Sequence, residues 1–479
     1  MNSQWEPVIG IEVHVQLATQ SKIFSNAPVE FGSEPNVNAN LVDVAMPGAL
    51  PVLNEDAVRM ALKFGLAIEA EIAERCVFDR KNYFYPDLPK GYQISQFASP
   101  IVGRGELDVH LDDGSVQSIG ITRAHLEEDA GKSIHDRFAQ HTGIDLNRAG
   151  TPLLEIVTEP DMRSAAQAAA CFRQLHGLVR WLQICDGNLA EGSMRCDANV
   201  SVRRSGESAF GERTEIKNIN SFRFVERAVN YEIDRQIDVL ESGGVVVRET
   251  RQYDADRDRT YSMRSKELSD DYRYFPDPDL LPLQLTADML EAVKESMPEL
   301  PREKLARYAQ EHELPPATAV RLTRDFDLAS IFDKTTDLGG DAQLVANWLL
   351  GDIAASLRRE DKTYAELPLT AQQLADLVKR IHDGTLSSTL AKEVFEFAWS
   401  TEDSIDAIIN ERGLQQVSDQ DELTALVQGI VDSHPAQVAQ IHAGQTKVVG
   451  FLVGQVMKQS QGKADPKQVN ALLRQMLNI

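Results

Sequence analysis

The segment from Val8 to Leu17 alternates strictly between apolar and polar side chains, which predicts an extended strand. The odd-numbered positions are all apolar, whereas the even-numbered positions from Gly10 onward include Glu12 and His14. Residues two apart in a strand have Cα atoms about 6.6 Å apart, so this carboxylate and imidazole could reach one ion between them. A half-buried strand whose polar side faces water is the simpler interpretation of this segment alone.

The length and charge of the chain limit its architecture and its partners. A chain of 479 residues is too long for one ordinary core, so we expect two or three domains. A net charge of −24 excludes a general nucleic-acid coat, because Lys and Arg contacts to phosphate dominate such binding. Any contact with nucleic acid must therefore be local.

The sequence predicts neither disulfides, nor a thiolate metal site, nor a membrane segment. The four cysteines are scattered, and none belongs to a Cys-x-x-Cys pair. The start of the chain lacks a basic segment followed by an apolar run, and no apolar stretch approaches the ~20 residues that span a bilayer. We therefore expect a cytoplasmic chain.

Aromatic, amide and cationic side chains are concentrated between Asp79 and Tyr92. Lys81, Tyr83 and Tyr85 are the candidates here for contact with a flat or anionic substrate. A folded corner without a ligand explains the same composition, and the residues alone do not choose between the two interpretations.

Three consecutive acids, Glu127, Glu128 and Asp129, follow an extended pattern over residues 119–126. Such a run is usually a solvated turn. If the preceding strand belongs to the same sheet as residues 8–17, these acids could instead complete the ion site begun there. The Gly-Lys-Ser that comes next is not a P-loop, because Leu126 stands where that motif requires its earlier glycine.

Arg148 lies in a segment whose backbone is restricted by a glycine and a proline. Its guanidinium group could pair with a phosphate through two hydrogen bonds. A structural ion pair with Asp145 or Glu155 is the safer interpretation of this segment by itself.

Two later segments repeat the alternation of the first strand. Over residues 194–202, Arg195, Asp197 and Asn199 oppose an apolar face, and over residues 214–218 Glu215 and Lys217 share a face. A surface-exposed sheet explains each segment separately, but a concave polar face explains them together. That face would gather Glu12, His14, Asp197, Asn199, Glu215 and Lys217.

Carboxylates with one imidazole suit Mg²⁺ better than a metal that prefers thiolates. Because Mg²⁺ usually works through substrate phosphates, the predicted face indicates phosphoryl transfer, in which positioning and charge neutralisation supply most of the catalysis. No serine or cysteine nucleophile with its base is recognisable in the local sequence.

The β-rich first part is interrupted by helices and gives way to helical patterns from Thr286 onward. In the first part we expect helices over residues 55–68, after a capping box that starts at Ser164, and after Ser221. In the second part Thr370 is predicted to cap a helix that ends at Gly384, and another helix is predicted over residues 418–431. The predicted fold class is α+β.

The segment from residue 433 to the end of the chain is locally basic, with Asp465 as its one opposing acid around the cations. A solvated helical surface without a partner is as good an interpretation as a nucleic-acid contact. The cations are Lys447, Lys458, Lys463, Lys467 and Arg474.

Several long motifs, in order along the chain, resemble the B subunit family of the tRNA-dependent amidotransferases, and the resemblance covers essentially the whole chain. They are Val-Ile-Gly-Ile-Glu-Val-His at 8–14, Asp-Arg-Lys-Asn-Tyr-Phe-Tyr-Pro-Asp at 79–87, His-Leu-Glu-Glu-Asp-Ala-Gly-Lys at 125–132, Asp-Leu-Asn-Arg-Ala-Gly-Thr-Pro-Leu-Leu-Glu at 145–155, Asp-Asp-Tyr-Arg-Tyr-Phe-Pro at 270–276 and Gly-Phe-Leu-Val-Gly-Gln-Val-Met-Lys at 450–458.

The resemblance implies an enzyme that converts Asp-tRNA(Asn) or Glu-tRNA(Gln) to Asn-tRNA(Asn) or Gln-tRNA(Gln). The B subunit would activate the side-chain carboxylate by phosphorylation from ATP with Mg²⁺. Ammonia from glutamine, made by an amidase A subunit, would then displace the phosphate, and a small C subunit would complete a heterotrimer. The implied domains are a β-rich cradle over residues 1–293, a helical domain over 294–405 and a tail over 406–479 that meets the tRNA.

The resemblance also implies roles for individual residues. The catalytic residues would be Glu12, His14, Glu128 and Lys217. The Mg²⁺ ligands would be Glu12, His14 and Glu128, with Glu127 next and Asp197 as a further candidate. The substrate-binding residues would be Lys81, Tyr83, Tyr85, Arg148, Asn199 and Glu215.

The chain departs from one family pattern. Some members carry paired cysteines for a structural zinc just before the turn at residues 47–48, and this chain has Val42–Met46 there. We therefore predict no zinc. The chain also lacks an amidase serine–lysine signature, so a partner would have to supply ammonia.

Two other classes of function remain open at this point. One is a non-catalytic subunit that binds tRNA and assists assembly, with purely structural acids. The other is a metal-dependent hydrolase of nucleotides or nucleic acid, for which acids and an imidazole on a sheet also suffice.

Overall fold

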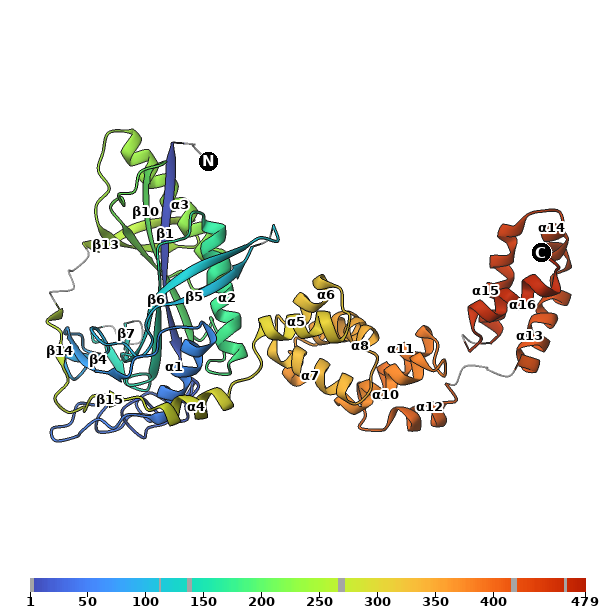
Figure 1. Ribbon diagram of the computed structural model, residues 1–479, viewed down its shortest axis with the longest axis horizontal. Coiled ribbons are helices and arrows are strands. Elements are labelled where there is room, and N and C mark those ends of the chain that lie inside the picture. Colours follow the sequence, from blue (N-terminus) through green and yellow to red (C-terminus); the bar gives the residue numbers. More distant parts are fainter. Residues whose placement is uncertain (1–3, 112, 136–139, 266–271, 415–419, 461–462) are drawn as a thin grey trace. The chain divides into compact units, whose positions relative to one another are not determined.

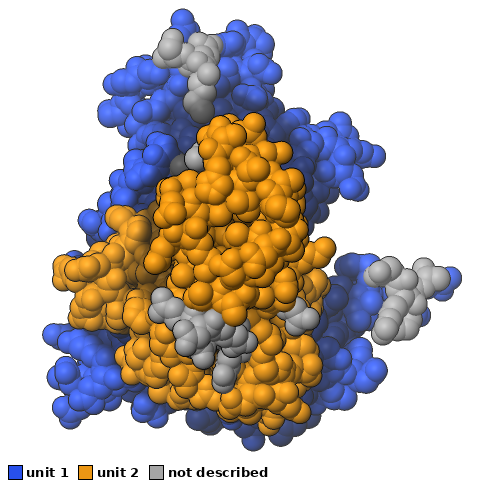
Figure 2. All heavy atoms as spheres, turned by 90° about the vertical axis from the view of Figure 1, so that its right-hand side faces the viewer, with its two compact units in different colours: residues 1–300 blue, residues 301–479 orange. Residues whose placement is uncertain are grey.

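The computed structural model describes residues 4–479 except 112, 136–139, 266–271, 415–419 and 461–462. The first two residues of the predicted motif at 270–276 and of the predicted helix at 418–431 therefore lie outside the described residues. The chain divides into two compact units, residues 1–300 and 301–479, which are coloured separately in Figure 2. The first unit is rich in strands and the second is helical, which confirms the predicted α+β class (Figure 1).

An eight-stranded sheet forms the centre of the first unit, with the order β13-β12-β11-β10-β1-β9-β6-β5. All neighbours in it are antiparallel except the parallel pair β11–β12. Its strands are β1 (Trp5–Gln16), β5 (Gly105–His110), β6 (Val116–Glu128), β9 (Pro152–Thr158), β10 (Met194–Arg204), β11 (Thr214–Lys217), β12 (Glu249–Asp254) and β13 (Arg259–Ser265).

The alternation predicted for the first strand is confirmed. The apolar residues Ile9, Ile11, Val13 and Val15 are at most 1% exposed and belong to the main hydrophobic core. The helices α2 (Ala165–Trp181) and α3 (Phe222–Glu241) contribute to the same core and lie against this face of the sheet (Figure 1). The opposite face of the sheet is thereby left for the polar residues.

Small elements complete the first unit beside the sheet. They are α1 (Glu55–Ala67), β2 (Arg75–Cys76), β3 (Asp79–Asn82), β4 (Tyr92–Ser95), β7 (Lys132–Ile134), β8 (Gly143–Asp145), β14 (Phe275–Pro276), β15 (Leu283–Gln284) and α4 (Ala287–Glu295). Strand β3 lies between β4 and β14, so the aromatic segment at 272–276 is held against the segment that begins at Asp79.

The helices begin where their caps predict. Ser221 and Thr370 accept hydrogen bonds from the third residue of their helices, and Thr370 forms a full capping box with Gln373. Ser164 also caps α2, but only one of the two hydrogen bonds of the predicted capping box forms as expected. The Gln167 side chain accepts from the N–H of Arg163 at 2.6 Å, one residue before the cap.

The second unit contains two separate hydrophobic clusters, one within residues 308–414 and one within residues 423–477. Its helices are α5 (Pro301–Glu311), α6 (Pro316–Leu322), α7 (Phe326–Asp337), α8 (Ala342–Trp348), a π-helical turn (Leu349–Ile353), α9 (Ala354–Arg359), a 3-10 turn (Tyr364–Glu366), α10 (Ala371–His382), α11 (Ser388–Ala398), α12 (Ile405–Arg412), α13 (Gln420–Ser433), α14 (Pro435–His442), a 3-10 turn (Thr446–Val448), α15 (Val449–Gln459) and α16 (Pro466–Met476). The predicted division at residues 405–406 stays a prediction.

In the described part of the chain, no helix combines the length and the apolar character that crossing a bilayer requires.

A buried ion pair forms within the segment between β1 and α1, and its lysine Nζ also donates to the carbonyl oxygen of Leu146, in the segment that precedes β9. Lys22 Nζ donates to Asp43 Oδ2 at 3.1 Å, and both side chains are almost completely buried. Asp43 occupies the region where some relatives were expected to carry zinc ligands, and the absence of zinc stays a prediction. Gly150 lies directly against this pair with φ +82°, and a Cβ atom there would lie 2.6 Å from Asp43 Oδ1.

We expect Gly150→Ala to lower the free energy of unfolding by about 2–5 kcal/mol, because the left-handed backbone strains an alanine and the methyl group would displace Asp43. Gly206→Ala is the matched control. Gly206 has φ +88° with open space around it, so only the backbone cost of about 1–2 kcal/mol applies. Urea unfolding followed by circular dichroism measures both, and equal losses would contradict the role given to the buried pair.

Candidate functional site

The strand register aligns the polar residues of the sheet in rows. Glu12 of β1 pairs with Asp197 of β10 on one side and with Val157 of β9 on the other, and Val157 in turn pairs with Arg123 of β6. Side chains in one row point to the same face, because successive residues of a strand alternate between faces. The polar residues predicted to share one face are therefore carried by neighbouring strands, and the concave shape of that face stays a prediction.

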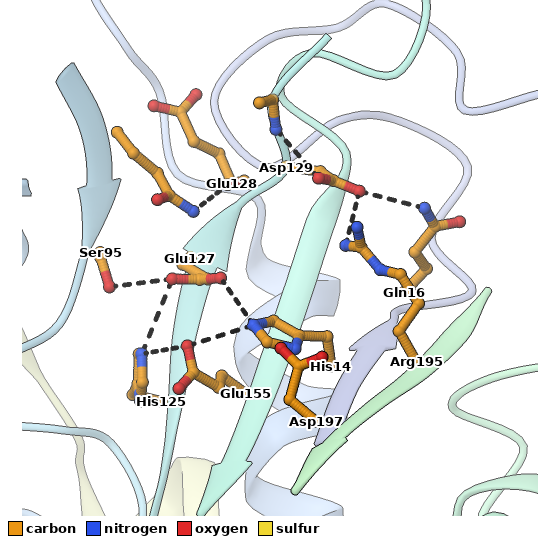
Figure 3. A network of polar contacts seen from close by, with 12 residues as sticks. His14, Gln16, Ser95, His125, Glu127, Glu128, Asp129, Glu155, Arg195 and Asp197 are labelled. Carbon is orange, nitrogen blue, oxygen red and sulfur yellow. Dashed lines mark hydrogen bonds and ion pairs between the residues drawn. The ribbon is translucent and has the colours of Figure 1, made fainter. Parts of the chain in front are cut away.

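The next row carries a cluster of acids and imidazoles. His14 pairs with Glu155 of β9, which pairs with His125 of β6, and Glu127 follows two residues later on the same face (Figure 3). We call His14, His125, Glu127 and Glu155 the carboxylate–imidazole cluster.

The side chains of the cluster converge closely. His14 Nε2 lies 3.5 Å from Glu155 Oε2 and 3.9 Å from Glu127 Oε1. His125 Nε2 lies 3.4 Å from Glu155 Oε2 and 3.7 Å from Glu127 Oε2. Ser95 Oγ donates to Glu127 Oε2 at 3.2 Å, which holds that carboxylate from the other side. Figure 3 shows the two carboxylates between the two rings.

The cluster stabilises positive charge. Burial alone would lower the pKa of His125, but Glu155 and Glu127 outweigh burial and raise that pKa to about 9. Burial would also lower the pKa of His14, but the same two acids outweigh burial and raise that pKa. Burial would raise the pKa of Glu155, but the two imidazoles hold it well below its ordinary value. Either protons on the rings or a bound cation can supply this charge.

The donor set fits a divalent cation. Ligand atoms of His14, Glu127 and Glu155 lie within 4.8 Å of one another. Carboxylate oxygens with one imidazole suit Mg²⁺, which binds through few protein ligands and retains waters. The Nδ1 atom of His125 is buried without a hydrogen-bond partner among the described residues, so that ring is oriented by the acids alone.

The residues that the structure groups around a possible metal ion are not the same set as the ligands predicted from the sequence. His14 and Glu127 belong to the three-residue group just described, and Glu155 joins them. Glu12 and Glu128 are outside this group among the described residues. Glu12 Oε1 instead accepts from Asn199 Nδ2 at 2.8 Å.

Glu128 differs from Glu127 because neighbouring residues of one strand face opposite sides. The Glu128 carboxylate accepts from Lys90 Nζ and from the N–H of Ile94, and Figure 3 shows it directed away from Glu127. Burial raises its pKa although the Lys90 ammonium opposes this. Its role as a ligand stays a prediction, and the protein already supplies partners for its charge.

Two predicted residues form an ion pair on the polar face. Lys217 Nζ donates to Asp197 Oδ2 at 2.7 Å and lies 3.6 Å from Glu215 Oε1. Burial would lower the pKa of Lys217, but the two acids outweigh it and raise the pKa. Lys217 therefore remains an ammonium group beside the row of Glu12.

The aromatic segment brings Lys81 to the cluster. Its Nζ atom lies 5.1 Å from the ring centre of Tyr272 and 5.9 Å from that of Tyr83. Burial opposes the charge of Lys81, yet Glu127, Tyr274 and Glu155 raise its pKa.

Tyr83 and Tyr85 differ in their surroundings. Tyr83 Oη donates to Gln93 Oε1 at 3.1 Å, and burial raises its pKa. Tyr85 is 52% exposed, with its ring centre 6.0 Å from that of Tyr83. Their substrate contacts stay predictions.

The structural ion pair considered for Arg148 does not form with the expected acids. Arg148 donates to the carbonyl oxygens of Ala130 and Gly131 and lies 3.6 Å from Asp129, not beside Asp145 or Glu155. Its guanidinium group thus orders the turn after β6. Whether Arg148 also contacts substrate stays a prediction.

Sequence reasoning overlooked Glu155 and His125 as members of the site. The signal was available for His125, since counting back by two from Glu127 reaches it. Glu155 could not be chosen in this way, because its place depends on β9 lying between β1 and β6.

The five predicted tRNA-binding cations lie in the last part of the second unit. Lys447, Lys458, Lys467 and Arg474 are exposed, and Lys463 is half-buried. Arg474 Nε donates to Asn470 Oδ1 at 3.0 Å. The cations therefore belong to the region around α15 and α16.

The sheet and its carboxylate–imidazole cluster belong to a known class of catalytic domain. A family model described as the GatB/GatE catalytic domain matches residues 7–291, and a second, described as the GatB domain, matches residues 330–477. This chain belongs to the GatB/GatE catalytic domain family.

Curated relatives match along nearly the whole chain. Proteins named as the B subunit of aspartyl/glutamyl-tRNA(Asn/Gln) amidotransferase are 56% identical in Thioalkalivibrio sulfidiphilus, 58% identical in Alkalilimnicola ehrlichii and 57% identical in Halorhodospira halophila. Each alignment covers 99% of this chain and at least 99% of the relative.

We expect Glu155→Gln to weaken binding of Mn²⁺, used as a spectroscopic substitute for Mg²⁺, by about tenfold or more, because it removes one of the two carboxylate ligands of the group. Paramagnetic resonance of free Mn²⁺ measures this affinity. Glu106→Gln, at an exposed position of β5, is the matched control and should bind normally. Unchanged binding by Glu155→Gln would contradict the assignment, and an equal loss in Glu128→Gln would restore Glu128 to the ligand set.

Proposed function

We propose that this chain acts as the B subunit of an aspartyl/glutamyl-tRNA(Asn/Gln) amidotransferase. It would use ATP to phosphorylate the side-chain carboxylate of Asp-tRNA(Asn) or Glu-tRNA(Gln), and ammonia would then convert the product to the amide. The observation that carries this proposal is the carboxylate–imidazole cluster on the sheet of a chain that belongs to the GatB/GatE catalytic domain family.

The first step forms an acyl phosphate. A carboxylate oxygen of the substrate attacks the γ-phosphorus of ATP, the new O–P bond forms, and the bond to the β,γ-bridging oxygen breaks to release ADP. Phosphoryl transfer of this kind depends mainly on positioning and charge neutralisation. Lys81 and Lys217, both held as ammonium groups by neighbouring acids, would attract the two anionic reactants to the polar face.

The residues that would hold Mg²⁺ are His14, Glu127 and Glu155, with Glu12, Glu128 and Asp197 as the further predicted ligands. The ion would neutralise phosphate charge when bound. The protein's own contribution is to hold the acids in place, since Ser95 and His125 both contact Glu127 Oε2.

The second step replaces phosphate by nitrogen. The lone pair of ammonia attacks the carbonyl carbon of the acyl phosphate, the C–N bond forms, the C–O bond to phosphate breaks, and a proton is lost. An amidase A subunit would release the ammonia from glutamine, and a small C subunit would complete the heterotrimer. We expect this complex to act in the cytoplasm.

We expect Glu12→Gln to lower the turnover of aminoacyl-dependent ADP release by about 10²-fold or more, because a predicted carboxylate ligand of Mg²⁺ is lost. Affinity for tRNA should hold. The assay uses the complex with its partner subunits, ATP, Mg²⁺ and misacylated tRNA, with Glu106→Gln as the control.

The same assay separates the two other classes of function. Unchanged turnover in Glu12→Gln would favour a non-catalytic assembly subunit. A hydrolase would cleave a phosphoester without needing the aminoacyl group, so ADP release with uncharged tRNA at the full rate would overturn the proposal.

The five cations around α15 and α16 would meet the tRNA. We expect replacement of Lys447, Lys458, Lys463, Lys467 and Arg474 by glutamine to raise the Michaelis constant for tRNA about tenfold and to weaken its dependence on salt, because phosphate contacts are lost. Glutamine hydrolysis by the partner should be unchanged.

Lys362, Lys379 and Lys392 provide the comparison for this set. They are exposed lysines of the preceding helical part, and their replacement by glutamine should leave the Michaelis constant for tRNA unaltered. Equal effects of the two sets would refute a specific tRNA contact by the tail.

A further inference from the structure

A permanent cation of the chain lies among the acids of the polar face. Arg195 of β10 pairs with His14 of β1, and Asp197 follows two residues later on the same face of the sheet. A guanidinium group keeps its charge throughout the physiological pH range. The side chain of Arg195 is only 30% exposed, so water screens its charge incompletely. This cation could therefore compete with Mg²⁺ for the same carboxylates.

The guanidinium group of Arg195 is held by Asp129. Arg195 Nη2 donates to Asp129 Oδ2 at 3.0 Å, and Gln16 Nε2 donates to the same oxygen at 3.3 Å (Figure 3). In the described part of the chain, Asp129 is the one acid within ion-pair distance of Arg195. Burial would lower the pKa of Arg195, but Asp129, Asp197 and Glu127 together outweigh burial and raise that pKa. Asp197 and Glu127 therefore attract Arg195 without forming an ion pair with it.

Asp129 is itself fixed by its surroundings. Its N–H donates to the carbonyl oxygen of Thr151 at 2.9 Å, and its own carbonyl oxygen accepts from the N–H of Gly150 at 2.9 Å. Its Oδ1 atom accepts from the N–H of Ala130 at 3.0 Å, and the residue is buried. The carboxylate therefore has a fixed place, and the longer side chain of Arg195 is drawn to it.

A side chain of Arg195 released from Asp129 would meet other acids. The Cα atom of Asp197 lies about 7 Å further along the same strand, and Glu127 lies 3.9 Å from the ring of His14, the residue opposite Arg195. An unpaired charge in a partly buried place is costly, so the guanidinium group would pair with one of these carboxylates. A guanidinium group beside Glu127 would neutralise a ligand of the cation and repel the cation itself.

We propose that Asp129 is a positioning residue that holds the Arg195 guanidinium group away from the carboxylate–imidazole cluster, so that Glu127 stays available to a divalent cation. Asp129 acts through Arg195, and it lies outside the group formed by His14, Glu127 and Glu155. The inference rests on the cation site of the proposed function. Because it concerns side chains of this chain alone, metal binding tests it without an assay of turnover.

The test is a double-mutant cycle on Asp129 and Arg195, in which paramagnetic resonance of free Mn²⁺ measures the affinity of the full chain for that ion. Asp129→Asn should weaken binding about tenfold, because the released guanidinium group competes with the ion. Arg195→Gln should change the affinity by about threefold or less, because Asp129 already keeps the guanidinium group out of the cluster. The double variant should bind within about threefold of the unaltered chain, because no guanidinium group is left to compete.

The dependence of turnover on Mg²⁺ in the complex with its partner subunits gives a second signature. Asp129→Asn should need about tenfold more Mg²⁺ for half-maximal turnover and should reach the unaltered kcat at saturation, whereas a damaged fold would lower kcat at every concentration. Asp129→Ser replaces this variant if the asparagine variant unfolds.

Glu6→Gln is the matched control, because it breaks a similar pair on the same two strands. Arg203 Nε donates to Glu6 Oε2 at 2.6 Å, and these residues pair across β10 and β1. Arg203 lies about 26 Å along the strand from Arg195, so its release should leave the affinity for Mn²⁺ unchanged.

The outcomes separate competition by Arg195 from simpler effects and from failure of the proposed function. Equal and opposite changes in the two single variants would mean that charge acts only at a distance, and would overturn the inference. Normal binding by Asp129→Asn, or a double variant as weak as that single variant, would also overturn it. An unaltered chain that does not bind Mn²⁺ would overturn the cation site together with this inference. A chain that binds Mn²⁺ but forms no amide from misacylated tRNA in the complex would overturn the proposed function alone.

Discussion

The two-residue period of the central sheet is the constraint on which the site depends. In β1 this period buries Ile9, Ile11, Val13 and Val15 on one face and places Glu12 and His14 on the other. Antiparallel pairing of β1 with β9 and β10, and of β9 with β6, repeats the same division in these strands. Helices α2 and α3 cover the apolar face, so charged groups collect on the opposite one without interrupting the core.

Collecting so many charges on a partly buried face requires mutual compensation. Removing charges from water is unfavourable, and close pairing with good geometry is what offsets it. Glu127 and Glu155 lie between two imidazoles with Lys81 nearby, and Asp197 lies against Lys217. A face arranged in this way favours anions bound together with a cation, which is the charge pattern of a nucleotide and its metal ion.

Local patterns predicted much of this arrangement, and pairing between distant strands accounts for the errors. Alternation alone placed His14 on the polar face, and side-chain caps located the starts of α3 and α10. Glu127 and Glu128 were both assigned to the ion site although adjacent strand residues face opposite ways. Treating the acids as a turn after the strand hid this, because β6 continues through Glu128.

The sequence by itself determined the α+β class, the alternating strands and the identity of the family, because short-range periodicity and long motifs are written in consecutive residues. Only the tertiary structure decided that Glu155 and His125 join His14, and that Asn199 and Arg123 each have a buried polar atom without a hydrogen-bond partner among the described residues. The reason is physical. Which strands become neighbours, and in which register, is decided by burial of the whole core, and no local segment contains that information.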